Sequence, residues 1–184
     1  KQGVILDLGT GPGYLPIEIV KRSPSIRVDG IDLSSRLIKM ARANAQREGF
    51  ADRLHFETGN AAQLRFEEAS YDMVISTGML HVLRDPVKVL KECYRILKPE
   101  GEAWIYDPAR VSSHMDIKRW KASLTIPERF MYLLFALFTR MNPPHRYLQE
   151  QVGALIAATP FKIRSIKEEK EEIRIKLRKP SLKT

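Results

Sequence analysis

The sequence predicts an α/β fold, built on a mainly parallel sheet with helices on both faces. Three observations lead to this prediction. Short apolar runs alternate with amphipathic helical patterns over the first 108 residues, and a glycine-rich turn joins the first run to the first helix. Near the end of the chain, apolar and charged residues alternate strictly in IRIKLR, which is the period of a β-strand.

Five apolar runs have the length of buried parallel strands, and turn residues bound most of them. Helical periodicity fills the gaps between several of these runs, as expected for right-handed crossovers. Ser34 or Ser35 can cap the second helix, and Gly49 ends it. The expected elements are strands at residues 4–8, 28–33, 54–57, 71–76 and 103–106, and helices at 14–22, 35–48 and 86–98. On the last helix we expect Val87, Leu90, Tyr94 and Leu97 to form the buried stripe.

The chain changes character after the fifth strand. Residues 111–160 contain no convincing strand, but they carry an aromatic helical pattern at 127–141 and another at 147–158. Residues 161–166 and 173–178 then have strand patterns that predict a hairpin closing the sheet. We expect one domain over residues 1–184, with a core at 4–108, a helical insertion or lid at 111–160 and a C-terminal hairpin at 161–178.

Composition excludes several classes of protein. The lone cysteine, Cys93, excludes an internal disulfide framework and a cysteine-based zinc site, and its apolar surroundings in the sequence indicate a core position. No metal site is expected. The longest apolar stretch, residues 130–138, is far shorter than the ~20 residues of a membrane span, and no signal peptide is visible. We therefore expect a soluble, cytoplasmic protein without a transmembrane segment.

The formal charge of +9 comes from one part of the chain. Residues 1–109 hold 15 basic and 15 acidic side chains, whereas residues 110–184 hold 16 and 7. A basic half is a candidate for contact with nucleic acid or another anionic surface. The last basic residues equally fit the solvated face of a strand; they are Arg174, Lys176, Arg178 and Lys179.

The turn LDLGTGPGYLP raises the question of its ligand, because glycines there let a ligand approach the backbone and a helix N-terminus. The dinucleotide fingerprint needs a glycine at its sixth position. Counted from Gly9 this position is Tyr14, and counted from Gly11 it is Pro16, so a nicotinamide cofactor is disfavoured. Asp32 ends the second strand, where a carboxylate can accept hydrogen bonds from both ribose hydroxyls. These features predict a nucleoside-like ligand.

Ligands of open α/β sheets bind at the carboxyl ends of the strands. This rule selects Ser76, Thr77 and His81 after the fourth strand, and Asp107 after the fifth. His81 is the best candidate for a general base, with a packing or capping role as its alternative. Asp107 is the second catalytic candidate, and its alternative role is to end a strand.

Four segments carry a resemblance to a known family: VILDLGTGPG, VDGIDLS, HFETGNAAQLRF and YDMVISTGMLHVLRDPVKVLKECYRILKPEG. They resemble the class I S-adenosylmethionine-dependent methyltransferases, in particular the small-molecule branch that includes enzymes of quinone biosynthesis. The resemblance covers about residues 4–108. It implies S-adenosylmethionine as cofactor and a Rossmann-like, doubly wound, mostly parallel sheet of seven strands whose last strand is antiparallel. The helical insertion expected from the sequence pattern follows the fifth strand.

The resemblance also implies a cofactor site. Asp7 would orient the methionine end along the glycine turn, Asp32 would hold the ribose, and Leu33 would flank the adenine. Asn60 takes the place of an acidic residue common in the family, and its side-chain oxygen can still accept from the adenine amino group. The expected cofactor-binding residues are Asp7, Gly9, Thr10, Gly11, Gly13, Asp32, Leu33, Asn60, Ala61, Ser76 and Thr77.

Methyl transfer to a small, partly apolar acceptor is the expected function. Residues 130–138 favour an apolar acceptor, either as a lid or as a helix lying on a membrane beside residues 118–121; a buried helix is the alternative. An RNA methyltransferase that uses the basic C-terminal half, and a cofactor-binding module without turnover, are the other functions considered.

The sequence differs in two places from patterns found in methyltransferases. Enzymes that methylate amino groups of DNA or proteins carry an Asn/Asp-Pro-Pro-aromatic motif after the fourth strand, where residues 76–79 read STGM. Asn142-Pro-Pro-His145 follows a helix in the insertion and is interpreted as a loop, so nucleic acid is disfavoured. Only three residues precede the first strand, where the family usually has helices, and we expect the sequence to be part of a longer chain.

Overall fold

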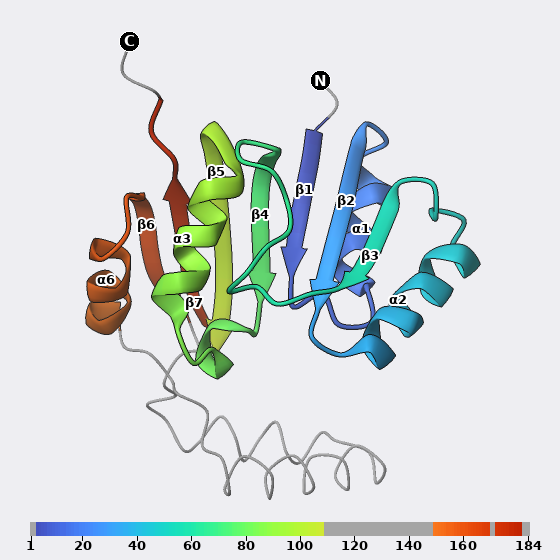
Figure 1. The fold of residues 1–184 in the computed structure, drawn as a ribbon, viewed down its shortest axis with the longest axis horizontal. Helices are drawn as coiled ribbons and strands as arrows, with labels where there is room; N and C mark the ends of the chain where they lie inside the picture. Colours follow the sequence, from blue (N-terminus) through green and yellow to red (C-terminus); the bar gives the residue numbers. More distant parts are fainter. Residues whose placement is uncertain (1–2, 109–148, 170–171, 182–184) are drawn as a thin grey trace, which may run out of the picture.

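Seven strands form one sheet in the order β3-β2-β1-β4-β5-β7-β6 in the computed structural model, which describes residues 3–108, 149–169 and 172–181 (Figure 1). β7 runs antiparallel to both β5 and β6, and the other pairings are parallel. The expected seven-stranded sheet with an antiparallel last strand is confirmed. The strands are β1 (Gly3–Leu8), β2 (Ile26–Asp32), β3 (Leu54–Thr58), β4 (Tyr71–Thr77), β5 (Leu97–Pro108), β6 (Lys162–Glu169) and β7 (Glu172–Arg178).

Helices cover both faces of the sheet. α1 and α2 pack over β2 and β3 on one face, while α3 and α6 pack over β4, β5 and β7 on the other; Figure 1 shows α3 in front of the sheet and α1 behind it. This arrangement confirms the predicted α/β class. The helices are α1 (Tyr14–Arg22), α2 (Ser35–Arg47), the short 3-10 helix η1 (Leu80–Val82), α3 (Pro86–Ile96) and α6 (Gln149–Ala157).

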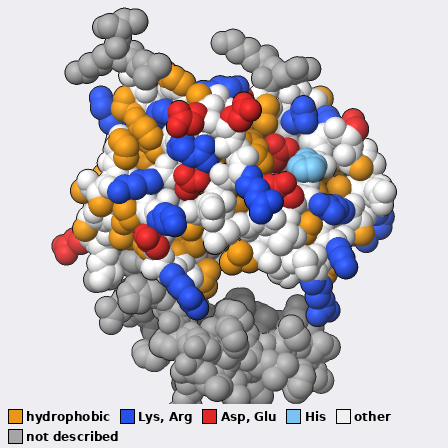
Figure 2. All heavy atoms as spheres, viewed as in Figure 1, with side chains coloured by type: hydrophobic (Ala, Val, Ile, Leu, Met, Phe, Trp, Pro, Cys, Tyr) orange, Lys and Arg blue, Asp and Glu red, His pale blue; other side chains and the backbone are white. Residues whose placement is uncertain are grey.

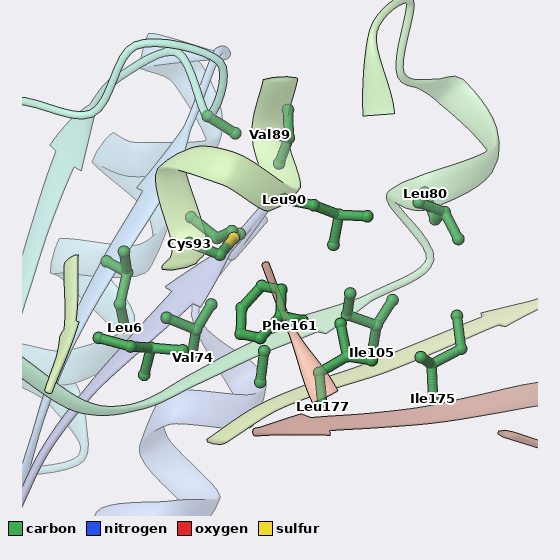
Figure 3. Close-up of a cluster of buried hydrophobic side chains, with 14 of the residues drawn as sticks. Leu6, Val74, Leu80, Val89, Leu90, Cys93, Ile105, Phe161, Ile175 and Leu177 are labelled. Carbon is green, nitrogen blue, oxygen red and sulfur yellow. The ribbon is translucent and has the colours of Figure 1, made fainter. Parts of the chain in front are cut away.

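The larger core lies between the sheet and the face that α3 and α6 cover. Leu6 of β1 and Val74 of β4 face Cys93 of α3, which is buried as expected, and Ile105 and Leu177 continue the layer on β5 and β7 (Figure 3). Each of these five side chains is at most 6% exposed. Burial of a Val, Leu or Ile side chain stabilises the fold by roughly 1.5–3 kcal/mol. This layer therefore holds α3 and the strands of the sheet in fixed positions.

The ends of the helices follow local capping rules. The Ser34 hydroxyl accepts the Leu37 N–H at 3.3 Å, which settles the start of α2. The Asp85 carboxylate accepts the Lys88 N–H at 2.9 Å, and proline fills the first helical position of α3.

The structure corrects the expectation for α3. The helix ends at Ile96 instead of residue 98, because the chain enters β5 at Leu97, whose backbone pairs with β4. Its buried stripe is Val89, Leu90, Cys93 and Ile96, not the predicted stripe at Val87, Leu90, Tyr94 and Leu97. The true stripe keeps i, i+3 and i+4 spacing but is rotated about the helix axis, and only packing against the sheet selects it.

α6 lies in the range that the sequence assigned to the insertion, and it packs into the main core. Val152 and Ile156 are 1% and 2% exposed, next to Leu80 and Ile105. The remaining predictions for the insertion, including its apolar segment at 130–138, lie at residues 109–148, outside the described residues. Within the described part of the chain, no helix has the length and apolar character needed to cross a membrane.

Candidate cofactor-binding and active site

A cavity of about 260 Å³ opens where β1, β2 and β3 end and where the chain leaves β4. The arrowheads of β1, β2 and β4 meet along this edge in Figure 1. Five of the predicted cofactor-binding residues line the cavity: Gly9, Asp32, Leu33, Asn60 and Ala61. The lining residues that the sequence analysis missed are Ile31, Gly59, Gly78, Met79, Val82 and Leu83.

The glycine turn borders this cavity and is held against β2. The N–H groups of Gly9 and Thr10 both donate to the Ile31 carbonyl at 2.9 Å. Gly9 has φ of 71°, and a Cβ atom there would lie 3.0 Å from the Met79 sulfur. Glycine therefore satisfies the left-handed backbone and the close approach of the loop after β4 at the same position.

Asp32 is fixed at the end of β2 by backbone donors. Its Oδ2 accepts the Gly11 N–H at 3.0 Å, and its Oδ1 accepts the Ser34 N–H at 2.8 Å. Each carboxylate oxygen keeps a second lone pair. The glycine turn thus orients a carboxylate that can accept two further hydrogen bonds from a ligand in the cavity.

Asp7 is a buried carboxyl group without a hydrogen-bond partner among the described residues. It is 1% exposed, and neither of its oxygens is within hydrogen-bond geometry of a donor; the hydroxyl of Thr10, 7% exposed, is unpaired as well. Burial raises the pKa of Asp7 to about 7, the nearby Thr10 hydroxyl offsets part of this rise, and the charge of Asp32 adds to it. Such an orphaned group beside the glycine turn fits a site for a cationic ligand.

The residues at the other end of the cavity come from the chain after β2 and β3. Leu33 is 75% exposed and offers an apolar surface. Asn60 follows β3, and its Oδ1 accepts the Ala62 N–H at 2.9 Å, a local turn that holds Asn60 and Ala61 at the cavity wall.

His81 and Asp107, predicted separately, form a pair. His81 Nδ1 lies 3.2 Å from both carboxylate oxygens of Asp107, and these oxygens also accept the backbone N–H groups of Leu80 and His81 at 2.9 and 3.0 Å. Burial raises the pKa of Asp107, and the hydrogen bonds from His81 and the two backbone N–H groups offset part of the rise. A carboxylate acceptor at Nδ1 fixes the tautomer that leaves Nε2 free to accept a proton.

The remaining predicted residues lie around the cavity without lining it. Gly13 caps the start of α1 with φ of 80°, and a Cβ atom there would meet Phe56 and Ala41. Ser76 is 2% exposed, and its hydroxyl donates to the Leu8 carbonyl at 3.1 Å, which ties β4 to β1. Thr77 is the exposed last residue of β4.

The missed residues belong mainly to the loop that follows β4. Met79 and Val82 flank the predicted base, and Gly78 has φ of 69°. A glycine directly after a strand was the available signal, because it allows the chain to turn over the strand end. The apolar residues of this loop fitted a position in the core or a position at a cavity wall equally well. The periodicity of the sequence does not distinguish these two positions.

Basic residues of the C-terminal hairpin are engaged within the fold. Arg174 pairs with Glu169 and Glu172, and Lys176 lies 3.7 Å from the centre of the Trp104 ring. Lys179 donates to the carbonyls of Tyr94 and Leu97 at the end of α3. Figure 2 shows acidic and basic side chains interspersed on the visible face. These contacts favour the solvated-face interpretation over an anion-binding surface.

Comparison with known proteins shows the family to which this chain belongs. A family model described as a methyltransferase domain matches residues 1–171, so the chain belongs to this family. Together with its sheet, this match places the chain among the class I S-adenosylmethionine-dependent methyltransferases, as the sequence predicted.

Its curated relatives include enzymes named for quinone biosynthesis. The chain is 28% identical over 158 residues to a demethylmenaquinone methyltransferase of Lactobacillus johnsonii, covering 85% of this chain and 63% of that protein. It is 33% identical over 107 residues to the ubiquinone/menaquinone biosynthesis C-methyltransferase UbiE of Geotalea daltonii, covering 57% and 45%. The chain thus spans about half to two thirds of the length of these relatives.

Solved structures share the fold at low sequence identity. A SAM-dependent methyltransferase from Aquifex aeolicus superposes with a TM-score of 0.73 at 18% identity, covering 97% of this chain and 82% of that one. Phosphoethanolamine N-methyltransferase 2 of Haemonchus contortus, in complex with S-adenosyl-L-methionine, gives 0.76 at 17% identity, covering 98% and 49%.

Proposed function

We propose that this protein transfers a methyl group from S-adenosylmethionine to a small, partly apolar acceptor. One observation carries the proposal: the Asp32 carboxylate, held by the N–H groups of Gly11 and Ser34, stands at a cavity that the glycine turn borders. A carboxylate fixed in this way recognises a ribose diol, and a glycine turn admits the chain attached to it.

Groups that line the cavity, and Asp7 buried beside it, suit different parts of the cofactor. The orphaned carboxyl group of Asp7 supports the methionine end, because the ammonium group there would supply its missing charge. Leu33 and Ala61 support the adenine end, since both present hydrocarbon to the cavity. Gly9, Thr10 and Gly13 belong to the glycine turn, and Ser76 and Thr77 end the neighbouring strand β4 without lining the cavity.

Positioning dominates the chemistry that the protein must supply. Bound S-adenosylmethionine supplies a methyl group already activated on a sulfonium. Holding the acceptor in line with it can contribute ~7–11 kcal/mol, whereas a positioned base contributes about 3–5.5 kcal/mol. We assign that base to Nε2 of His81, which would take the proton that the acceptor loses while Asp107 stabilises the resulting imidazolium.

The apolar character of the acceptor is inferred from the surface beside the His81–Asp107 pair. Met79, Val82 and Leu83 line the cavity within two residues of His81 and offer it an apolar wall. Two curated relatives are named as a demethylmenaquinone methyltransferase and as a ubiquinone/menaquinone biosynthesis C-methyltransferase, which supports a quinone-like acceptor. We infer an acceptor with an apolar ring and an ionisable group or carbon that His81 can deprotonate.

Replacement of Asp32 tests the cofactor assignment. Asp32→Ala should weaken S-adenosylmethionine binding by ~1.5–3 kcal/mol, the contribution of hydrogen bonds to a charged group. Calorimetry on both proteins measures the difference, and Asp52→Asn, which removes an exposed carboxylate far from the cavity, is the matched control. Unchanged affinity in Asp32→Ala, or equally tight NAD binding by the wild type, contradicts the assignment.

Replacement of His81 tests the dyad. His81→Gln should lower kcat by roughly 10²–10⁴ while leaving cofactor affinity within about threefold, because a general base acts only in the chemical step. Asp107→Asn should shift the pH profile of kcat, since the amide no longer fixes the Nδ1–H tautomer. Screening acceptors with labelled cofactor supplies the assay. A His81→Gln variant with full activity would assign His81 to packing.

A further inference from the structure

The loop between β3 and β4, residues 59–70, carries one wall of the cofactor cavity. Gly59, Asn60 and Ala61 line the cavity where the loop leaves β3, and the loop then crosses the face of the sheet that α3 covers (Figure 1). Its backbone forms one isolated bridge, between Asn60 and Gln63, and no regular helix or strand. The position of the wall therefore depends on contacts between the loop and other elements.

Two charged side chains of α3 hold the loop at Leu64. Glu92 Oε2 accepts the Leu64 N–H at 2.8 Å, and Arg95 Nη2 donates to the Leu64 carbonyl at 2.9 Å. A second nitrogen of Arg95, Nη1, donates to the Phe66 carbonyl at 2.8 Å. Because α3 engages both backbone polar groups of Leu64, the loop cannot shift there without losing charge-assisted hydrogen bonds.

Glu92 and Arg95 also hold each other in place. Nε and Nη2 of Arg95 donate to the two carboxylate oxygens of Glu92, each at 2.9 Å, and the side chains are 28% and 21% exposed for Arg95 and Glu92. Arg95 holds the pKa of Glu92 below its ordinary value, and burial offsets part of this effect. The planar guanidinium group presents its donors in a fixed geometry, so one rigid group binds the carboxylate and both loop carbonyls.

A hydrogen-bonded turn connects Leu64 to the cavity wall. The Asn60 carbonyl accepts the Gln63 N–H at 2.9 Å, next to the Leu64 anchor. At the other end of the wall, the Gly59 N–H donates to the Asp32 carbonyl at 3.0 Å. The wall is thus held by β2 on one side and by α3 on the other.

We propose that Glu92 and Arg95 are positioning residues for the cofactor: they hold the loop after β3 so that residues 59–61 form a fixed wall for the nucleoside base. The inference rests on the proposed cofactor role of the cavity. Neither side chain lines the cavity, so both act through the loop backbone. Other contacts orient the Asp32 carboxylate, so the effect should be confined to the base.

Two ligands that differ only in the base test the inference. Calorimetry measures S-adenosylhomocysteine directly and S-ribosylhomocysteine, which carries no base, by competition at millimolar concentration. The ratio of their dissociation constants gives the contribution of the base to affinity. The variants are Arg95→Met, Arg95→Lys and, as control, Lys98→Met. Lys98 lies 2.9 Å from Asp72, the second residue of β4, whereas the cavity lies at the carboxyl ends of the strands.

We expect Arg95→Met to bind S-adenosylhomocysteine about tenfold or more weakly and S-ribosylhomocysteine within about threefold of the wild type. A wall that is no longer held in place lowers affinity only for the ligand that contacts it. Arg95→Lys should lower the ratio by about threefold or more, because an ammonium group cannot reproduce the fork that binds Glu92 and both carbonyls. Lys98→Met should keep the wild-type ratio.

The ratio separates positioning from a loss of stability, because a variant that is only less stable loses affinity for both ligands by the same factor. An Arg95→Met variant with the wild-type ratio overturns the inference and leaves the cofactor role intact. If Arg95→Met does not fold, an unchanged ratio in Arg95→Lys overturns it. A wild type that binds both ligands equally well also does so. If the folded wild type binds neither ligand, the proposed cofactor role fails as well.

Discussion

Two carboxylates close to the same glycine turn have opposite surroundings. Asp32 accepts two backbone N–H groups, whereas Asp7 is buried without a partner among the described residues. Burial raises the pKa of Asp7 to about 7. In the free protein Asp7 is therefore a cost to folding that a bound cation would relieve.

At the residue scale, we expect the stability of the free protein to fall as pH rises through the range from 4 to 7. The folded pKa of Asp7 lies above its ordinary value of 3.8, so between these values the folded state holds a proton that the unfolded state has lost. Asp7→Asn removes this penalty. It should match the wild type near pH 4 and exceed it at pH 8 by on the order of 4 kcal/mol.

Urea denaturation at both pH values measures the effect, with Asp52→Asn as the control for loss of an exposed carboxylate. A wild type and an Asp7→Asn variant whose stabilities keep a constant difference from pH 4 to pH 8 would contradict the shifted pKa.

At the scale of elements, the start of α1 depends on one glycine for two reasons. Gly13 has φ of 80°, and a Cβ atom there would lie 2.9 Å from the Phe56 ring and 3.0 Å from the Ala41 side chain. Close packing of α1 on α2 and β3 thus fixes the N-terminal end of α1 beside the cavity. The glycine turn that borders the cavity therefore also fixes the position of α1.

We expect Gly13→Ala to destabilise the protein by roughly 2–5 kcal/mol, the sum of a left-handed backbone penalty and an overpacked contact. Gly49→Ala is the matched control, because Gly49 has φ of 77° and no atom within 4 Å of its Cβ position. It should cost only about 1–2 kcal/mol. Thermal denaturation compares the two. Equal losses would show that the contact with Phe56 and Ala41 has no energetic weight.

At the scale of the whole molecule, α6 packs into the core that the N-terminal strands and α3 form. Val152 and Ile156 bury against residues of η1, α3, β5 and β7, and Phe161 stacks edge-to-face on Tyr94 of α3 with ring centres 5.2 Å apart. The C-terminal part is therefore integral to the core that positions His81 and Asp107.

Ile156→Ala should cost ~2–5 kcal/mol of stability, since it removes a buried side chain and leaves a cavity. Unfolding should remain a single transition by circular dichroism and by fluorescence, because the helix and the sheet share one core. The exposed Ile163 of β6, which is 50% exposed, provides the control as Ile163→Ala. An early separate transition in Ile156→Ala would instead indicate a lid that moves independently of the sheet.

Local patterns in the sequence determined the alternating elements, the glycine turn and the position of Asp32 at a strand end, because strand periodicity, caps and turns depend on neighbouring residues. The cavity residues Gly9 and Asp32 were predicted for the same reason, whereas Leu33, Asn60 and Ala61 were predicted from the resemblance to a known family. Only the tertiary structure decided the strand order, the stripe that α3 buries, the His81–Asp107 pair and the apolar wall at Met79 and Val82. His81 and Asp107 are 26 residues apart, and they meet because β4 and β5 pair in register. Such contacts depend on how distant segments close and pack together, and no local pattern in the chain encodes that geometry.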